Sequence, residues 1–186
     1  GFATACRRLL ADDGVSSFEF QYLGELISQT EFDTIYHEHF SYLSLTAAEA
    51  VLEAAGLTGF EVERLTTHGG SLRVYAQVAG GRGLPVARSV DLLRAEEAEL
   101  GLRTSFFYSG FQPRVNLIRD QLRSFLIDAR KEGRTVVGYG AAAKGNTLLN
   151  YAGVGPDLVR YVVDNNPAKQ GHYLPGSHNP IVEEHR

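Results

Sequence analysis

Hydrophobic and polar positions in the first eighty residues follow a helical period in some stretches and a strand period in others. The pattern predicts a helix over 2–13, a strand over 15–22 and a polar connection over 24–33. It then predicts a helix over 46–56 and two strands, over 60–67 and 71–78. Thr46, with Glu49 three residues later, predicts a capping box at the start of the second helix. Gly69-Gly70 is a hairpin signal, so we expect one antiparallel edge strand in an α/β sheet.

The second half of the chain reads as two helices and then a β-α-β unit. A turn-rich linker is predicted over 80–85, followed by helices over 86–102 and 111–132. The β-α-β unit is predicted as a strand over 135–140, a helix over 141–152 and a strand over 159–164. The helix predicted over 111–132 carries a continuous apolar stripe, which predicts core packing. The closing β-α-β unit predicts half of a Rossmann-like sheet.

Composition narrows the classes of protein that the chain can represent. The net charge of -4 argues against a nucleic-acid-binding surface, which would be basic. No apolar run approaches the roughly 20 residues that span a bilayer, and the single Cys6 fits a reducing, cytoplasmic setting. Helix-like sequence begins at once and a strand-like run, 180–182, almost ends the chain, so we expect a piece of a longer polypeptide.

Residues 34–42 hold the densest group of side chains that exchange protons near neutral pH. Tyr36, His37, Glu38 and His39 follow one another there, and they indicate a general base supported by a carboxylate and a phenol. In an extended loop Tyr36 and Glu38 would point one way, whereas in a helical turn Tyr36 and His39 would share a face. No metal site is expected, because the two histidines are two residues apart and no cysteine assists them.

A glycine motif after the predicted strand 135–140 is the second candidate site. Gly138-x-Gly140-x-x-Ala143, followed by Lys144, indicates a turn that admits a nucleotide or phosphate at a helix N-terminus. Asp164 lies near the place of a ribose-binding acid. The alternative is a tight strand-to-helix turn with no ligand.

Two further stretches admit a structural and a functional interpretation. The hairpin explains Gly69 and Gly70 fully, while His68 and Arg73 beside them would face the same site as Tyr36 if neighbouring strands end together. The loop 165–171 follows a strand and would contact a ligand at that strand's carboxyl end.

Three motifs together, residues 32–42, 67–73 and 138–146, resemble the S-adenosylmethionine-dependent sugar C-methyltransferases. Members of that family methylate nucleotide-linked keto-deoxysugars at carbon. They have a small zinc-binding N-terminal region, a central class I methyltransferase domain and a C-terminal Rossmann-like domain. The resemblance implies that 1–80 is the end of the methyltransferase domain, and that 81–186 holds linker helices and a Rossmann-like nucleotide-sugar-binding domain cut short at its end.

The resemblance also implies roles for the candidate residues. His39 would be the base that removes a proton next to the sugar ketone, and Glu38 and Tyr36 would orient the sugar or stabilise the enolate. The substrate-binding residues would be His37, His68, Arg73, Gly138, Tyr139, Gly140, Lys144, Asn146 and Asp164. The zinc cysteines and the loop that binds S-adenosylmethionine are absent from this sequence, so we expect this piece alone to be inactive.

Two other functions stay open at this stage. One is a fragment of an NAD(P)-dependent oxidoreductase built on residues 138–164, and the other is a non-catalytic module that binds a nucleotide-sugar. The sequence does not define the sugar, the nucleobase, the methylated carbon, the stereochemistry or the oligomeric state.

Overall fold

The computed structural model describes residues 1–184. The chain folds as two compact units. Unit 1 comprises Gly1–Glu31 and Phe40–Phe111, and unit 2 comprises Phe32–His39 and Gln112–Arg186. A short segment from the first forty residues therefore belongs to the same unit as the C-terminal half of the chain.

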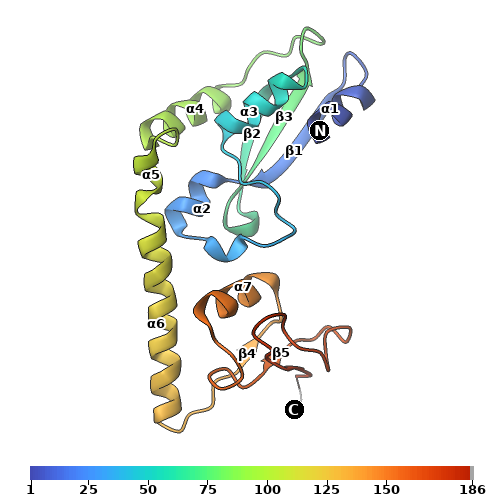
Figure 1. Ribbon diagram of the computed structural model, residues 1–186. Helices are drawn as coiled ribbons and strands as arrows, with labels where there is room; N and C mark the ends of the chain where they lie inside the picture. The colour runs from blue at the N-terminus through green and yellow to red at the C-terminus, as the bar shows by residue number, and fades with distance from the viewer. Residues whose placement is uncertain (185–186) are drawn as a thin grey trace. The chain divides into compact units, whose positions relative to one another are not determined.

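The sheet of unit 1 has three antiparallel strands in the order β1-β3-β2 (Figure 1). They are β1 (Val15–Gln21), β2 (Leu57–Leu65) and β3 (Ser71–Val78). All three were predicted, and β2 pairs with β3 as the hairpin signal indicated, but the expected place of the antiparallel strand was wrong. The hairpin does not add one antiparallel strand to an edge: every pair is antiparallel and β3 is the central strand. Among the described residues, β1 pairs with β3 only.

The expected polar connection over 24–33 is also wrong. The structure has a helix there, α2 (Leu23–Gln29), and a 3-10 turn, η1 (Phe32–Thr34). Leu26 and Ile27 of α2 are buried, and so are Phe32 and Thr34 of η1. Leu23, Leu26 and Ile27 do have the i, i+3, i+4 spacing of a helix, but the pattern covers barely one turn among polar residues, so the segment was predicted as a polar connection.

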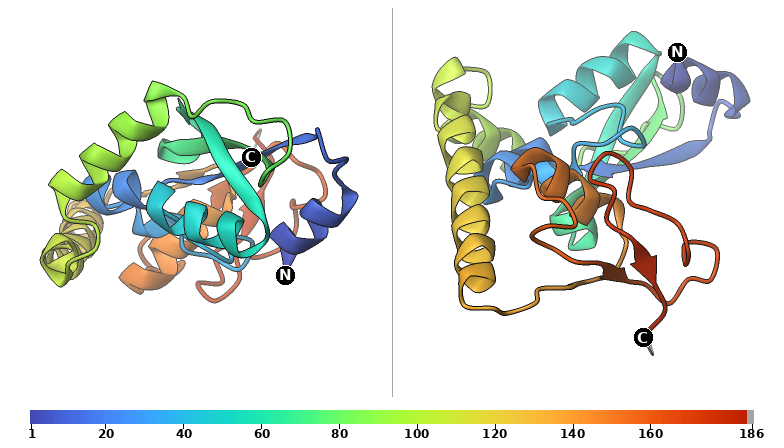
Figure 2. Two further views of the ribbon diagram at one scale, coloured as in Figure 1. Left: turned by 90° about the horizontal axis from the view of Figure 1, so that it is seen from above. Right: turned by 60° about the horizontal axis from the view of Figure 1, so that its bottom comes forward.

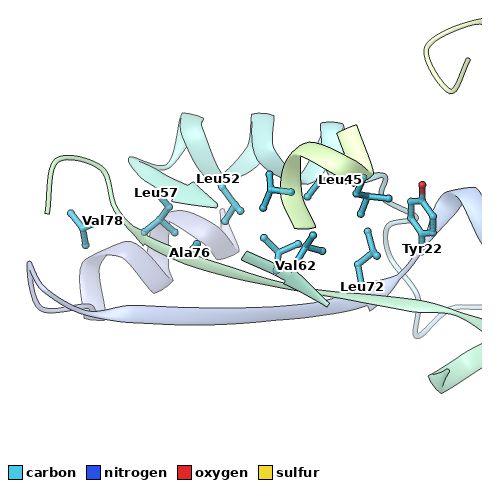
Figure 3. Packing of buried hydrophobic residues seen from close by; sticks show 11 residues of the cluster. Tyr22, Leu45, Leu52, Leu57, Val62, Leu72, Ala76 and Val78 are labelled. Atoms are coloured by element: carbon cyan, nitrogen blue, oxygen red, sulfur yellow. The ribbon is translucent and has the colours of Figure 1, made fainter. Parts of the chain in front are cut away.

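Helices α3 (Leu45–Ala54) and α4 (Arg88–Leu100) pack on one face of this sheet, as Figure 3 shows for α3. The remaining helices of the unit are α1 (Phe2–Leu9), α2 and α5 (Ser105–Ser109). Between helices and sheet lies one buried apolar cluster, which includes Tyr22, Leu45, Leu52, Leu57, Val62, Leu72, Val74, Ala76 and Val78 (Figure 3). Burial of these side chains is the main stabilising term of the unit.

Helix α3 begins by a different device from the predicted capping box. The N-cap is Ser44, whose Oγ accepts a hydrogen bond from the Ala47 N–H at 3.0 Å. Glu49 does not reach back to the helix start, because its carboxylate pairs with Arg94 of α4. The buried carboxylate of Glu97, also on α4, accepts from the N–H groups of Leu45 and Thr46 at 2.6 and 2.9 Å. A side chain from a distant helix therefore satisfies donors that the local sequence leaves open.

Gly69 and Gly70 do more than turn the chain between β2 and β3. At Gly70, where φ is 143°, a Cβ would lie 2.9 Å from the Cβ of Glu25. At Gly69, where φ is 85°, it would overlap the carboxylate of Glu31. Both glycines are needed because Glu25 of α2 and Glu31, two residues after its end, approach the backbone closely here.

The long helix α6 (Phe111–Lys131) confirms the predicted helix over 111–132. Its apolar stripe is core only in part, since Val115, Leu126 and Ala129 are buried whereas Phe125 is 59% exposed. Within residues 1–184 no helix combines the length and the apolar character that crossing a bilayer requires.

Unit 2 carries the β-α-β unit that the sequence predicted. Strands β4 (Gly138–Tyr139), β5 (Val162–Val163) and β6 (Ile181–Val182) are parallel and adjacent in that order. Helix α7 (Ala143–Ala152) connects β4 to β5, and Figure 2 shows it beside the strands. The strands are shorter than expected, and no helix connects β5 to β6 in the described structure.

Candidate functional site

The acid–base cluster forms a tight turn, the second of the two arrangements considered from the sequence. The N–H of His39 donates to the carbonyl of Tyr36 at 3.0 Å. The two rings stack with centroids 4.5 Å apart and planes inclined by 34°. His37 and Glu38 lie at the exposed tip of the turn. The turn thus presents one stacked phenol–imidazole pair and two solvent-facing polar groups.

The turn Tyr36–His39, named the catalytic turn for the role proposed below, is held against α7 by the residues just before it. Asp33 lies 3.7 Å from the Lys144 ammonium in the first turn of α7. Phe32 packs its ring against Tyr151 near the other end of α7, at 5.0 Å between centroids. These contacts explain why Phe32–His39 groups with unit 2. This segment lies within 1–80, the range predicted to be the end of a methyltransferase domain. That domain assignment, and the one for 81–186, stay predictions.

An open groove of about 510 Å³ in unit 2 brings two of the predicted motifs together. Tyr36 and His37 of the catalytic turn line it. So do the start of α7, including the predicted Asn146, and the loop 168–175. Candidate residues about a hundred positions apart in sequence therefore border one cavity.

The N-terminus of α7 gives the groove its electrostatic character. Its N-cap is Ala142, which supplies no side-chain hydrogen bond to the free N–H groups of the first helical turn. The positive end of the helix dipole thus remains open to an anion. Lys144 and Lys169 lie beside it, each about two-fifths exposed. Gly140, with φ of 90°, makes the turn into the helix that other residues would resist.

Asp164 contributes to this end of the groove by holding the loop in place. Its carboxylate accepts from the N–H of Ala141 at 2.7 Å and from the N–H of Asn166 at 2.8 Å. Lys169 Nζ donates to it at 3.2 Å and to the Ala141 carbonyl at 2.9 Å. The hydrogen bonds from Asn166 and Ala141, with Lys169 adding to them, hold the pKa of Asp164 below its ordinary value. A role in binding ribose stays a prediction.

Tyr139 lies at the carboxyl ends of the short parallel strands and is 70% exposed. Its hydroxyl lies 3.3 Å from Glu184 Oε1 and 3.3 Å from Asn165 Nδ2. Gly138, its neighbour in β4, packs against Val162 of β5, where an added Cβ would approach to 3.1 Å. Close packing against Val162 therefore gives a structural reason for a small residue at position 138, independent of any ligand.

The remaining two candidates, His68 and Arg73, belong to unit 1. His68 has a left-handed backbone with φ of 53°, and its carbonyl lies 3.4 Å from Gln21 Nε2. Arg73 on β3 pairs with Glu19 at 2.8 Å and with Glu63 at 3.5 Å on the strands to either side. That pairing, with a second hydrogen bond from Thr67, holds the pKa of Glu19 below its ordinary value. The structure gives Arg73 a cross-strand role, and substrate contact by either residue stays a prediction.

Sequence reasoning did not select three residues that the structure places at the site. His172 and Tyr173 line the groove, and Asp33 tethers the catalytic turn. Lys169 also lines the groove, and it belongs to the loop 165–171 that the sequence predicted to contact a ligand. Asp33 directly precedes the acid–base cluster, but its partner Lys144 is visible only in three dimensions.

The described residues contain no group of three or more His, Cys, Asp or Glu side chains arranged to hold a metal ion. They also do not fit S-adenosylmethionine. The strand–glycine turn–helix of unit 2 is the nearest arrangement, and the acid at its second strand, Asp164, is bonded to the loop itself.

The geometry places a groove at the uncapped N-terminus of α7 beside the turn Tyr36–His39, and comparison with known proteins gives the family. Residues 66–186 match the model of the C-methyltransferase C-terminal domain. The chain belongs to the C-methyltransferase family. It is 40% identical over 173 residues to the C-methyltransferase NovU of Streptomyces niveus, a match that covers 93% of this chain and 41% of that protein. The chain thus spans about two-fifths of the length of this curated relative.

Proposed function

We propose that the full-length protein transfers a methyl group from S-adenosylmethionine to a carbon next to the ketone of a nucleotide-linked keto-deoxysugar. This chain supplies the part that holds the sugar nucleotide. The observation that carries the proposal is the groove itself, because it joins the catalytic turn to the open N-terminus of α7. A diphosphate at the helix end would leave the attached sugar to reach the turn.

The residues of the turn suit proton abstraction next to a carbonyl. His39 takes the proton from the carbon beside the ketone, and the electron pair of that C–H bond moves onto the ketone oxygen as an enolate. Tyr36, stacked on His39, and Glu38 are placed to orient the base or to stabilise the enolate oxygen. S-adenosylmethionine, bound elsewhere in the full-length protein, would supply the methyl group: the enolate carbon would bond to the methyl carbon as its bond to sulfur breaks, the ketone would re-form, and S-adenosylhomocysteine would leave. His39 then returns its proton to solvent.

The antiparallel sheet of unit 1 supports a place at the end of a class I methyltransferase domain. Strand β1 has one edge without a partner among residues 1–184. An open edge offers N–H and C=O groups that another strand satisfies. We assign that strand, and the site for S-adenosylmethionine, to parts of the full-length protein outside this chain.

An NAD(P)-dependent oxidoreductase is not favoured. Such an enzyme would use the acid after its second strand on the ribose hydroxyls. Here Asp164 is bonded to Ala141, Asn166 and Lys169, and the family match is to methyltransferases.

Titration of this chain with a dTDP-linked sugar tests the proposal. We expect binding, and we expect Lys144→Ala to weaken it about tenfold, the effect of losing one charged contact of about 1.4 kcal/mol. Isothermal titration calorimetry measures both. Lys131→Ala is the matched control, because that ammonium is 70% exposed on α6 and pairs with Asp128. No binding of the sugar nucleotide, or tight binding of S-adenosylmethionine instead, contradicts the proposal.

A further inference from the structure

Tyr151 lies at the meeting point of α6, α7 and the segment before the catalytic turn. Its hydroxyl donates to Asn116 Oδ1 at 2.7 Å and accepts from Gln112 Nε2 at 2.8 Å. Gln112 Nε2 also donates to Asn116 Oδ1 at 3.0 Å, so the three side chains close a ring of hydrogen bonds. The Arg119 guanidinium lies over the phenol face, 6.0 Å from its centroid. These contacts fix the ring of Tyr151 on α6.

The ring of Tyr151 is also the surface on which Phe32 rests. Phe32 is 7% exposed and meets Tyr151 at 5.0 Å and 57°, a tilted aromatic pair. The carbonyl of Phe32 accepts from the Ile35 N–H at 3.0 Å, and the catalytic turn begins at the next residue. A shift of Phe32 is therefore transmitted to Tyr36 through one turn of hydrogen-bonded backbone.

Tyr151 itself does not line the groove. It lies eight residues beyond Ala143, so about 12 Å separates it along α7 from the helix end that faces the groove. The anion-binding end and the support for the catalytic turn are thus opposite ends of one helix. Asp33 and Lys144 form the second tether, at the groove end.

We infer that Tyr151 is a positioning residue: its ring, fixed on α6, sets where Tyr36 and His39 stand relative to the substrate bound at the start of α7. This inference rests on the proposed function. Under this inference the two ends of α7 have different roles: the N-terminus holds the nucleotide, and the Tyr151–Phe32 pair near the other end aligns the base. Removal of the ring should misplace the base without removing a substrate contact, and misplacement by about 1 Å costs up to a hundredfold in rate.

Kinetics of the full-length methyltransferase test the inference first. We expect Tyr151→Ala to lower kcat at least tenfold and to leave KM for the sugar nucleotide within twofold. Tyr151→Phe keeps the ring against Phe32 and should restore kcat to within about threefold of the wild type. An unchanged kcat in Tyr151→Ala, or a loss that appears mainly in KM, overturns the positioning role.

Amide hydrogen exchange of this chain tests the same coupling without any assay of activity. Tyr151→Ala should speed exchange at Ile35 and His39 at least tenfold while Val162 of β5 keeps its wild-type rate. Unchanged exchange at Ile35 and His39, or equal acceleration at Val162, overturns the inference, because Tyr151 would then be a general core residue. If the wild-type enzyme neither binds nor methylates a sugar nucleotide, the proposed function fails, and the exchange result still decides the coupling.

Discussion

Replacement of His39 by glutamine in the full-length methyltransferase is expected to lower kcat by about three orders of magnitude. A positioned general base contributes about 10² to 10⁴ in rate, and glutamine keeps the polarity and approximate size of the side chain but takes no proton. KM for the sugar nucleotide should change little, because the nucleotide is held at the start of α7. Steady-state methyl transfer, with the folded state checked by circular dichroism, measures the effect.

A second histidine of unit 2 provides the control for this substitution. His178 is exposed, lies outside the catalytic turn, and has a left-handed backbone with φ of 58° that asparagine tolerates. His178→Asn should retain wild-type kcat. If His39→Gln also retains it, another group removes the proton and the assignment of the base is wrong.

Replacement of Glu97 by alanine is expected to lower the stability of unit 1 by about 3 kcal/mol. The carboxylate is 2% exposed and accepts from the Leu45 N–H, the Thr46 N–H and the Thr46 hydroxyl, the last at 2.6 Å. Each donor left without a partner in the interior costs about 1 kcal/mol or more. Amide exchange at Val74, in the central strand, reports the free energy of opening of this unit.

Glu99 on the same helix α4 is the matched control, because its side chain is exposed. Glu99→Ala should change the opening free energy by less than about 0.5 kcal/mol, as surface substitutions generally do. An equally small effect of Glu97→Ala would show that the start of α3 does not depend on α4.

The parts of the fold that local pattern controls were predictable. The three strands of unit 1 and the helix over 111–132 follow from apolar period and glycine punctuation. The cap of α3 was not predictable, because Glu97 reaches it from about fifty residues away. The order β1-β3-β2 was missed for a related reason. The hydrophobic pattern of a strand does not indicate which distant strand it pairs with.

The arrangement of the candidate site was only partly predictable from the sequence. A run of Tyr, His, Glu and His predicts proton transfer, a glycine turn before a helix predicts an anion site, and both stay predictions. The sequence does not show that Phe32 and Asp33 attach the first motif to the helix of the second. The sequence also does not show that Lys169, from the predicted loop 165–171, donates to the Ala141 carbonyl of the glycine turn.

A crystal structure of the full-length protein with a dTDP-linked keto-sugar tests the central claim most directly. The account predicts the diphosphate at the N-terminus of α7 beside Lys144, with the carbon next to the ketone within hydrogen-bonding reach of His39. A nucleotide bound away from the start of α7, or a sugar whose ketone lies far from Tyr36 and His39, would contradict it.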